Sequence, residues 1–88
     1  MRLDKFLKVS RIIKRRTVAN ELCSRGKILV NDHVAKPSKT VKVGDVLDIN
    51  LGDKGRLICE VLEAPEGNVS KNQASSLYKL ISETTNSD

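Results

Sequence analysis

Aromatic residues are almost absent from this chain of 88 residues, which contains one Phe, one Tyr and no Trp. Proteins that read unstacked single strands of nucleic acid generally use aromatic rings as platforms on which bases stack. We expect Phe6 in the core, and Tyr78 lies outside the basic part of the chain. Aromatic base stacking is therefore excluded as the main way in which this chain could bind a nucleic acid.

Groupings that would support metal binding or catalysis are also missing. Cys23 and Cys59 are far apart, there is no CxxC motif, and His33 is the sole histidine, beside a predicted turn. We expect two buried free thiols rather than a disulfide or metal ligands. No Ser or Cys has a nearby base, and no Gly-rich phosphate loop is present. We therefore expect no enzymatic activity, no metal and no cofactor.

Long apolar runs are absent as well. No run approaches the roughly 18 residues that a membrane span needs, and the basic N-terminus lacks the apolar segment and small-residue cleavage site of a signal peptide. A chain this short forms one domain and buries only about 60% of its unfolded surface, which leaves no room for a deep cleft. We expect a single cytoplasmic domain.

Positive charge is abundant and concentrated at the start of the chain. The first sixteen residues, MRLDKFLKVSRIIKRR, hold seven Lys and Arg against one acid, Asp4. At about 100° per residue, Leu3, Phe6 and Leu7 share one face of a helix, and cations occupy the opposite side. A basic surface on a rigid element is typical of a protein that binds polyanions.

The charge is also divided between the two halves of the chain. Residues 2–42 hold twelve Lys and Arg against three Asp and Glu, a net charge of +9, whereas residues 43–88 have a net charge of −4. This division predicts one anion-binding surface on the N-terminal half rather than a uniform coat.

Periodicity predicts two helices followed by a small sheet. The helices are expected at about 2–9 and 18–25, with a break at 9–13, Thr17 as the second N-cap and Gly26 just after the second helix. Strands are expected at 28–30 and 33–35 around an Asn31-Asp32 turn, and then near 47–51 and 57–61. Residues 64–73 are expected to be a polar loop, 74–81 one or two helical turns, and 83–88 a frayed tail.

These elements make an α+β domain with two N-terminal helices packed on a small curled antiparallel sheet and a short C-terminal helical segment. We expect the main domain at 1–63, followed at 64–88 by the polar loop, the short helical segment and the frayed tail. The predicted core consists of Leu3, Phe6, Leu7, Val18, Leu22, Ile28, Val30, Val46, Ile49 and Val61.

An ordered set of short motifs in residues 1–50 strongly resembles the S4 RNA-binding domain. The motifs are Arg-Leu-Asp-Lys-Phe-Leu at 2–7, Ser-Arg at 10–11, Lys-Arg-Arg-Thr at 14–17, Gly26, Val-Asn at 30–31, Lys-Pro-Ser at 36–38 and Val-Gly-Asp at 43–45. The order is what makes the match specific. The chain length and the Ala-x-x-Leu-Tyr segment at 74–78 further resemble the RqcP (heat-shock protein 15-like) family of ribosome-associated quality control factors.

The resemblance implies a role in the rescue of stalled translation. Members of this family bind a free large (50S) ribosomal subunit that still carries peptidyl-tRNA, contact 23S rRNA and the tRNA, and support processive C-terminal alanine tailing with an RqcH-type partner. It implies a non-enzymatic, cytoplasmic, ribosome-associated protein, and we expect a monomer. The alternative is a general binder of structured RNA or rRNA in ribosome recycling or assembly.

The residues expected to contact RNA are all cationic. They are Arg2, Lys5, Lys8, Arg11, Lys14, Arg15, Arg16 and Lys36. Cations of this kind suit the phosphates of folded RNA, and the arginines add bidentate contacts that lysine does not make. Arg2 and Arg16 are expected to be the strongest contacts, since each lies at the start of a helix whose dipole also favours phosphate.

Other roles remain open for several of these residues. A single exposed lysine is often only solvated. Asp4 either complements the N-terminus of the first helix or orients a contact arginine. Arg25 either complements the end of the second helix or binds RNA, and Lys36 and Lys39 lie at the rim of the expected contact.

Two further classes of protein are weighed against RNA binding. A DNA-binding helix-turn-helix is disfavoured because the second helix exposes Asn20, Glu21 and Ser24, which form a poor surface for phosphates. A membrane-surface helix is disfavoured because its apolar face is short and lacks Trp.

Overall fold

The computed structural model describes residues 1–67 and 69–84 of the chain. The two helices, α1 (Leu3–Val9) and α2 (Arg16–Ser24), precede the strands β1 (Ile28–Val30), β2 (His33–Val34), β3 (Val46–Asn50), β4 (Arg56–Val61) and β5 (Tyr78–Thr84). Two short 3-10 helices, η1 (Gly52–Lys54) and η2 (Lys71–Leu77), precede β4 and β5. No helix among the described residues is long and apolar enough to cross a membrane.

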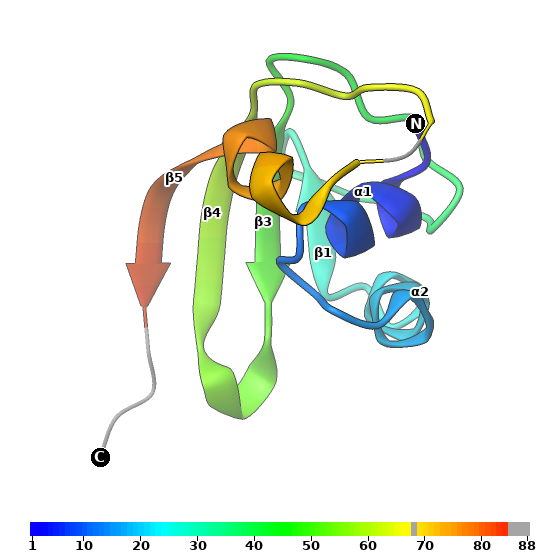
Figure 1. Cartoon of the computed structure of the whole chain (residues 1–88). Coiled ribbons are helices and arrows are strands. Elements are labelled where there is room, and N and C mark those ends of the chain that lie inside the picture. The colour runs from blue at the N-terminus through cyan, green and yellow to red at the C-terminus, as the bar shows by residue number, and fades with distance from the viewer. Residues whose placement is uncertain (68, 85–88) are drawn as a thin grey trace.

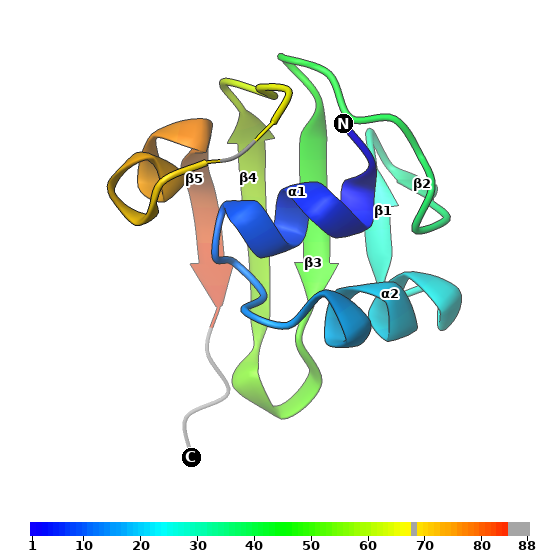
Figure 2. The same ribbon diagram turned by 45° about the vertical axis from the view of Figure 1, so that its right-hand side comes forward.

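These five strands form one antiparallel sheet in the order β2-β1-β3-β4-β5. Both helices lie on the same face of this sheet, with α1 across its middle and α2 beside β1 (Figures 1 and 2). The predicted α+β architecture is therefore confirmed.

The core lies between α1 and the sheet. Leu3, Phe6 and Leu7 are fully buried, as the helical spacing predicts, and they share one apolar cluster with Ile28 and Ile49. Val30 and Val61 also belong to this cluster, and Leu22 packs against it while partly exposed.

Local turn chemistry places β1 and β2 as predicted. Gly26 has φ +74° just after α2; its N–H donates to Cys23 O and that of Lys27 donates to Leu22 O, the Schellman pattern that ends a helix. Asn31 and Asp32 both have positive φ, as a two-residue hairpin turn requires. The turn prediction is confirmed at both places.

The second helix begins earlier than predicted. Arg15 is its N-cap residue, and the Arg15 carbonyl accepts hydrogen bonds from the N–H groups of Val18 and Ala19. Thr17 is therefore the second residue of α2, and its prediction as N-cap is wrong.

Two residues of the predicted core lie outside it. The small residues Ala19 and Cys23, spaced four apart, face the core, and Val18 is rotated by one position so that it is 40% exposed. Val46 is only half-buried because the strand alternation places Leu47 and Ile49 inward.

The predicted C-terminal helical turns are confirmed for residues 74–77 and wrong for residues 78–81, which form a strand. Residues 71–77 form η2, which begins with a capping box between Ser70 and Gln73, and Tyr78–Thr84 then pairs with β4 as strand β5. The edge of β4 would otherwise present unpaired backbone groups, and this tertiary demand overrides the helical spacing of Leu77 and Ile81. Of the predicted frayed tail, residues 83 and 84 belong to β5, and 85–88 lie outside the described residues.

Candidate nucleic-acid interface

The start of α1 is fixed by the loop that carries Lys36 and Lys39. Leu3 N–H donates to Lys39 O at 2.8 Å, and Asp4 N–H donates to Pro37 O at 3.1 Å. The N-cap residue of α1, Arg2, forms an isolated β-bridge with Thr40. These contacts bring the Lys-Pro-Ser segment beside Arg2, although the two are more than thirty positions apart in the sequence.

The first N–H groups of an α-helix have no partner within the helix, but those of α1 have acceptors in the protein. In addition to the N–H groups of Leu3 and Asp4, the N–H group of Lys5 donates to Asp4 Oδ1 at 2.8 Å. Protein acceptors thus satisfy the first three N–H groups of α1 (Leu3, Asp4 and Lys5), so these amides are not free to bind phosphate. Any phosphate contact at the N-terminus of α1 therefore depends on the donors of the Arg2 side chain rather than on these amides.

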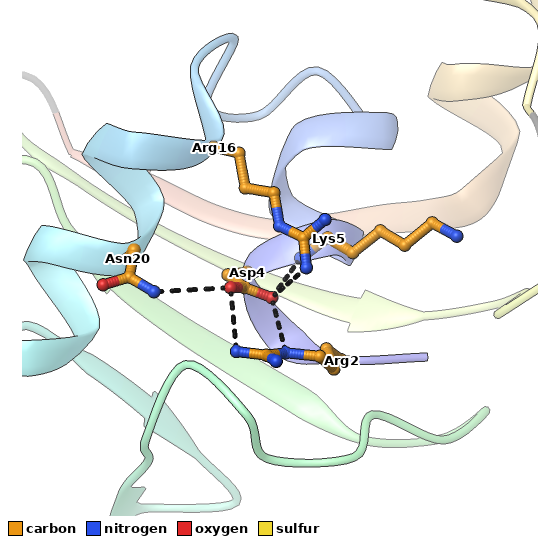
Figure 3. A network of polar contacts seen from close by, with 5 residues as sticks. All are labelled: Arg2, Asp4, Lys5, Arg16 and Asn20. Atoms are coloured by element: carbon orange, nitrogen blue, oxygen red, sulfur yellow. Dashed lines mark hydrogen bonds and ion pairs between the residues drawn. The ribbon is translucent and has the colours of Figure 1, made fainter.

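Asp4 is the centre of a polar cluster between the two helices (Figure 3). Arg2 makes two contacts of 3.3 Å with it, Nε to Oδ1 and Nη2 to Oδ2. Arg16 Nη2 donates to Oδ1 at 3.3 Å, and Asn20 Nδ2 donates to Oδ2 at 3.4 Å. One carboxylate therefore positions both arginines that the sequence ranks highest.

Asp4 is only 2% exposed, yet it is held in its charged form. Burial disfavours the carboxylate, but the hydrogen bonds from Arg16 and Asn20 and the positive charges of Arg16 and Arg2 outweigh burial. The pKa of Asp4 consequently lies below its usual value. The sequence left two roles open for Asp4. Its contacts support the role of orienting the arginines.

The arginine side chains stay largely in solvent. About half of the surface of each remains exposed, 53% for Arg2 and 45% for Arg16. A guanidinium has five N–H donors in a planar fork, so each arginine keeps donors for an outside acceptor while Asp4 fixes its direction. Oriented, half-exposed guanidinium groups suit the recognition of phosphate.

Three other predicted residues join Arg16 around one hollow. Lys5, Lys8, Arg11 and Arg16 line a surface hollow of about 340 Å³, and Lys71 of η2 faces them. Lys71 is a cation that the sequence did not indicate, because η2 reaches α1 only through the tertiary fold. Among the described residues, five cations and no acid line this hollow.

The remaining predicted residues lie on either side of this centre. Lys14 and Arg15 line a second hollow with Arg11 and Lys54, at the connection between the helices. Lys36 lines a third hollow with Arg2 and Arg25. Arg11 lines two of the hollows and Asp4 contacts both Arg2 and Arg16, so the eight predicted residues are linked to one another. We call this linked set the basic face.

Arg25 has a partner of its own on the helix surface. Its Nη2 lies 2.7 Å from Glu21 Oε1, an exposed ion pair one helical turn apart. It therefore has a local structural role at the end of α2, while it also borders the hollow that contains Arg2 and Lys36.

Both cysteines are buried and free, as expected. Burial raises the pKa of the Cys23 thiol to about 11, with a further contribution from the charge of Asp4, and burial raises that of Cys59 to about 12. Thiols with such pKa values are protonated at neutral pH and are poor nucleophiles.

The chain resembles known proteins over most of its length. Residues 1–47 match the S4 domain. The chain is 51% identical over 83 residues to the RQC P-site tRNA stabilizing factor of Listeria monocytogenes, covering 94% of this chain and 88% of the relative. It is equally similar, 51% over 84 residues, to the factor of the same name from Streptococcus pneumoniae, covering 96% of this chain and 93% of the relative.

A solved structure has the same fold over most of its length. Heat shock protein 15 of Vibrio cholerae, described as trimeric, superposes with a TM-score of 0.81 at 28% sequence identity. The superposition covers 92% of this chain and 81% of that protein.

Proposed function

The chain belongs to the S4-domain family, among the RQC P-site tRNA stabilizing factors and heat-shock protein 15-like proteins, and we propose that its basic face binds RNA of a stalled ribosomal particle. The particle is an obstructed free large (50S) subunit that retains peptidyl-tRNA. The protein contacts 23S rRNA and the tRNA, and it acts as a cytoplasmic, ribosome-associated binding factor rather than as an enzyme.

The observation that carries this proposal is the cluster of Arg2, Asp4 and Arg16. A buried carboxylate that orients two half-exposed guanidinium groups is a rigid receptor for backbone phosphates. The three residues come from one chain, so a single copy is sufficient for the site. Phosphate contacts of this type fix the position of a protein on folded RNA without reading its sequence.

A factor that stabilises a tRNA on the particle would support processive alanine tailing by an RqcH-type partner. Each cycle of tailing leaves the growing chain on a tRNA, and a bound factor that favours one tRNA position favours the next cycle. The cations of the basic face are distributed over three hollows, so the face offers separate phosphate contacts to two RNA segments.

Sucrose-gradient sedimentation tests the proposal. We expect the unaltered chain to travel with free large subunits and Arg2→Ala and Arg16→Ala to remain near the top of the gradient, each still folded by circular dichroism. Lys79→Ala, which removes an exposed cation on β5, is the matched control and should sediment like the original chain.

Tail length distinguishes the proposal from a general RNA-binding role. Under the proposal, the arginine variants also shorten C-terminal alanine tails in cells. Failure to sediment with unchanged tails would instead favour a role in ribosome recycling or assembly. Release by Lys79→Ala alone would place the interface on the sheet and contradict the assignment to the helices.

A further inference from the structure

The second hollow on the basic face combines large aliphatic side chains with a row of cations. It measures about 550 Å³ and lies where the connection between α1 and α2 meets the first turns of α2 and the end of β3. Its apolar lining consists of Ile12, Ile13, Val18, Leu22 and Leu51. We call it the apolar hollow.

The apolar floor of this hollow is accessible to solvent. Val18 is 40% exposed although it sits in the first turns of an amphipathic helix, and Ile12, Leu22 and Leu51 are only partly buried. Exposed apolar groups that gather in one concave place mark a binding site more often than scattered ones do.

Among the described residues, every charged side chain that lines the apolar hollow is a cation. Arg11, Lys14, Arg15 and Lys54 surround the floor without an acid among them. Among residues 1–67 and 69–84, none of these four forms an ion pair, whereas Arg2, Arg16, Arg25 and Arg56 all do. The ligand that complements this arrangement has a flat or apolar part and negative charges close to it.

We propose that the apolar hollow receives one unpaired nucleotide of the bound RNA, with its base on the aliphatic floor and its flanking phosphates on the rim. This inference rests on the proposed function and adds a second type of contact to it. The faces of a nucleobase are apolar and its phosphates are anionic, so a single nucleotide satisfies both parts of the hollow. A volume of 550 Å³ lies within the range of about 300–1,000 Å³ typical of small-ligand sites.

Continuity with the phosphate-binding centre favours RNA over an acidic peptide. Arg11 lines both the apolar hollow and the hollow formed with Lys5, Lys8 and Arg16, so an RNA strand that follows the cations passes directly over the floor. The planar guanidinium groups of Arg11 and Arg15 can stack on a base in place of the missing aromatic rings.

The backbone of Arg11 supports a role at this junction. Its φ is +63°, a left-handed conformation that is uncommon for residues other than Gly, Asn and Asp. Ser10 is buried and donates from Oγ to Leu7 O at 3.2 Å, which fixes the turn just before Arg11. The turn thereby projects a cation between the two hollows, and strained residues of this kind concentrate at binding sites.

Binding of defined RNA hairpins tests the inference. The probes are four hairpins with a single unpaired nucleotide, one for each base, and the same hairpin fully paired. We expect the unaltered chain to bind at least one bulged hairpin about tenfold more tightly than the paired one at the same salt concentration. Val18→Ser should remove this preference and leave the affinity for the paired hairpin unchanged.

Two matched variants separate the floor from the phosphate contacts. Thr17→Ser, an exposed neighbour outside the hollow, should keep the preference. Arg16→Ala should weaken binding of bulged and paired hairpins by the same factor, because its contact is to the backbone. A 4-thiouridine placed at the bulge should cross-link to the segment 11–22.

The outcomes distinguish this inference from the proposed function. Equal affinity of the unaltered chain for bulged and paired hairpins, or cross-links only to the sheet, would overturn the nucleotide site while sedimentation with large subunits still supports the proposed function. If the unaltered chain fails to sediment, the proposed function itself is wrong. If Val18→Ser releases the chain from subunits but changes no hairpin affinity, the hollow takes a protein segment and the inference is overturned.

Discussion

Asp4 accepts a hydrogen bond from Arg16, which lies twelve positions further along the chain, with 3.3 Å between Oδ1 and Nη2. The same oxygen lies 3.3 Å from Arg2 Nε, so two cations that would otherwise repel each other share one buried anion. This arrangement links α1 to α2 at the point where RNA contact is proposed. Preorganised donors lose less conformational entropy on binding than freely moving side chains do.

The first prediction concerns acid stability. The pKa of Asp4 is lower in the folded chain than the unfolded value of about 3.9, so its ionised form contributes stability above about pH 4. That contribution is lost as the pH falls from there through the folded pKa. Asp4→Asn should cost about 1–3 kcal/mol at pH 7 and much less at pH 3. Urea unfolding at both pH values measures this, and an equal cost at both would contradict the ionised cluster.

The second prediction concerns the chemistry of Arg16. Arg16→Ala should weaken RNA binding by roughly 1–3 kcal/mol, the range for removing a charge-assisted hydrogen bond. Arg16→Lys should recover only part of this affinity, because lysine keeps the charge but lacks the planar fork. Removal of one phosphate-binding cation should also reduce the steepness of log affinity against log salt by about 0.7–0.9. Salt titrations of the three chains measure both effects, and full recovery by lysine would show that only charge matters.

The third prediction concerns the core beneath the site. Phe6 is fully buried between α1 and the sheet, so Phe6→Ala should lower the free energy of unfolding by about 3–5 kcal/mol. In a domain this small that decrease is a large part of the total stability. Val43→Ala, at a residue that is 67% exposed, is the control and should change stability by less than about 0.5 kcal/mol. A thermal melt unchanged by Phe6→Ala would mean that α1 is not packed on the sheet.

The parts of the fold that the sequence predicts well depend on local signals. The apolar spacing of Leu3, Phe6 and Leu7 determines the buried face of α1, and Gly26 and the Asn31-Asp32 turn determine where β1 begins and ends. Strand β5 depends instead on a partner that lies far away in the sequence. Its register against β4 includes a bulge at Ile58 and Cys59, and the short segment by itself has spacing compatible with a helix.

The candidate site also combines features that local sequence shows with features that depend on the tertiary fold. Its cations can be predicted from the sequence because seven of them fall within sixteen residues. The orientation that Asp4 gives to Arg2 and Arg16 cannot, because it requires α1 and α2 to pack together. Lys54 and Lys71 join the basic face from η1 and η2, and no local pattern marks them. The exposure of Val18 depends on how α2 is rotated against the core, which places Ala19 rather than Val18 inward.

The fourth prediction concerns thiol reactivity. With pKa values raised to about 11 and about 12 by burial, Cys23 and Cys59 should react only slowly with a disulfide reagent at pH 8 in the native protein. Both should react at once in denaturant. Absorbance of the released thiol measures the two rates, and rapid reaction in native buffer would contradict the burial of these side chains.

The fifth prediction concerns strand β5, the element whose type the sequence did not predict. Six residue pairs join it to β4, and Tyr78 packs against the core cluster opposite Val61. A chain ending at Leu77 lacks this ladder, so its free energy of unfolding should fall by at least about 2 kcal/mol, since each net hydrogen bond contributes about 1 kcal/mol. It should also associate through the newly exposed edge of β4, because unpaired strand edges template pairing with other chains. A chain ending at Thr84 keeps every described element and is the matched control. Thermal melts and size-exclusion chromatography of the two chains provide the measurement. If the chain ending at Leu77 melts and elutes like the one ending at Thr84, the pairing of β5 with β4 adds nothing to stability, and η2 would be the last segment that the fold requires.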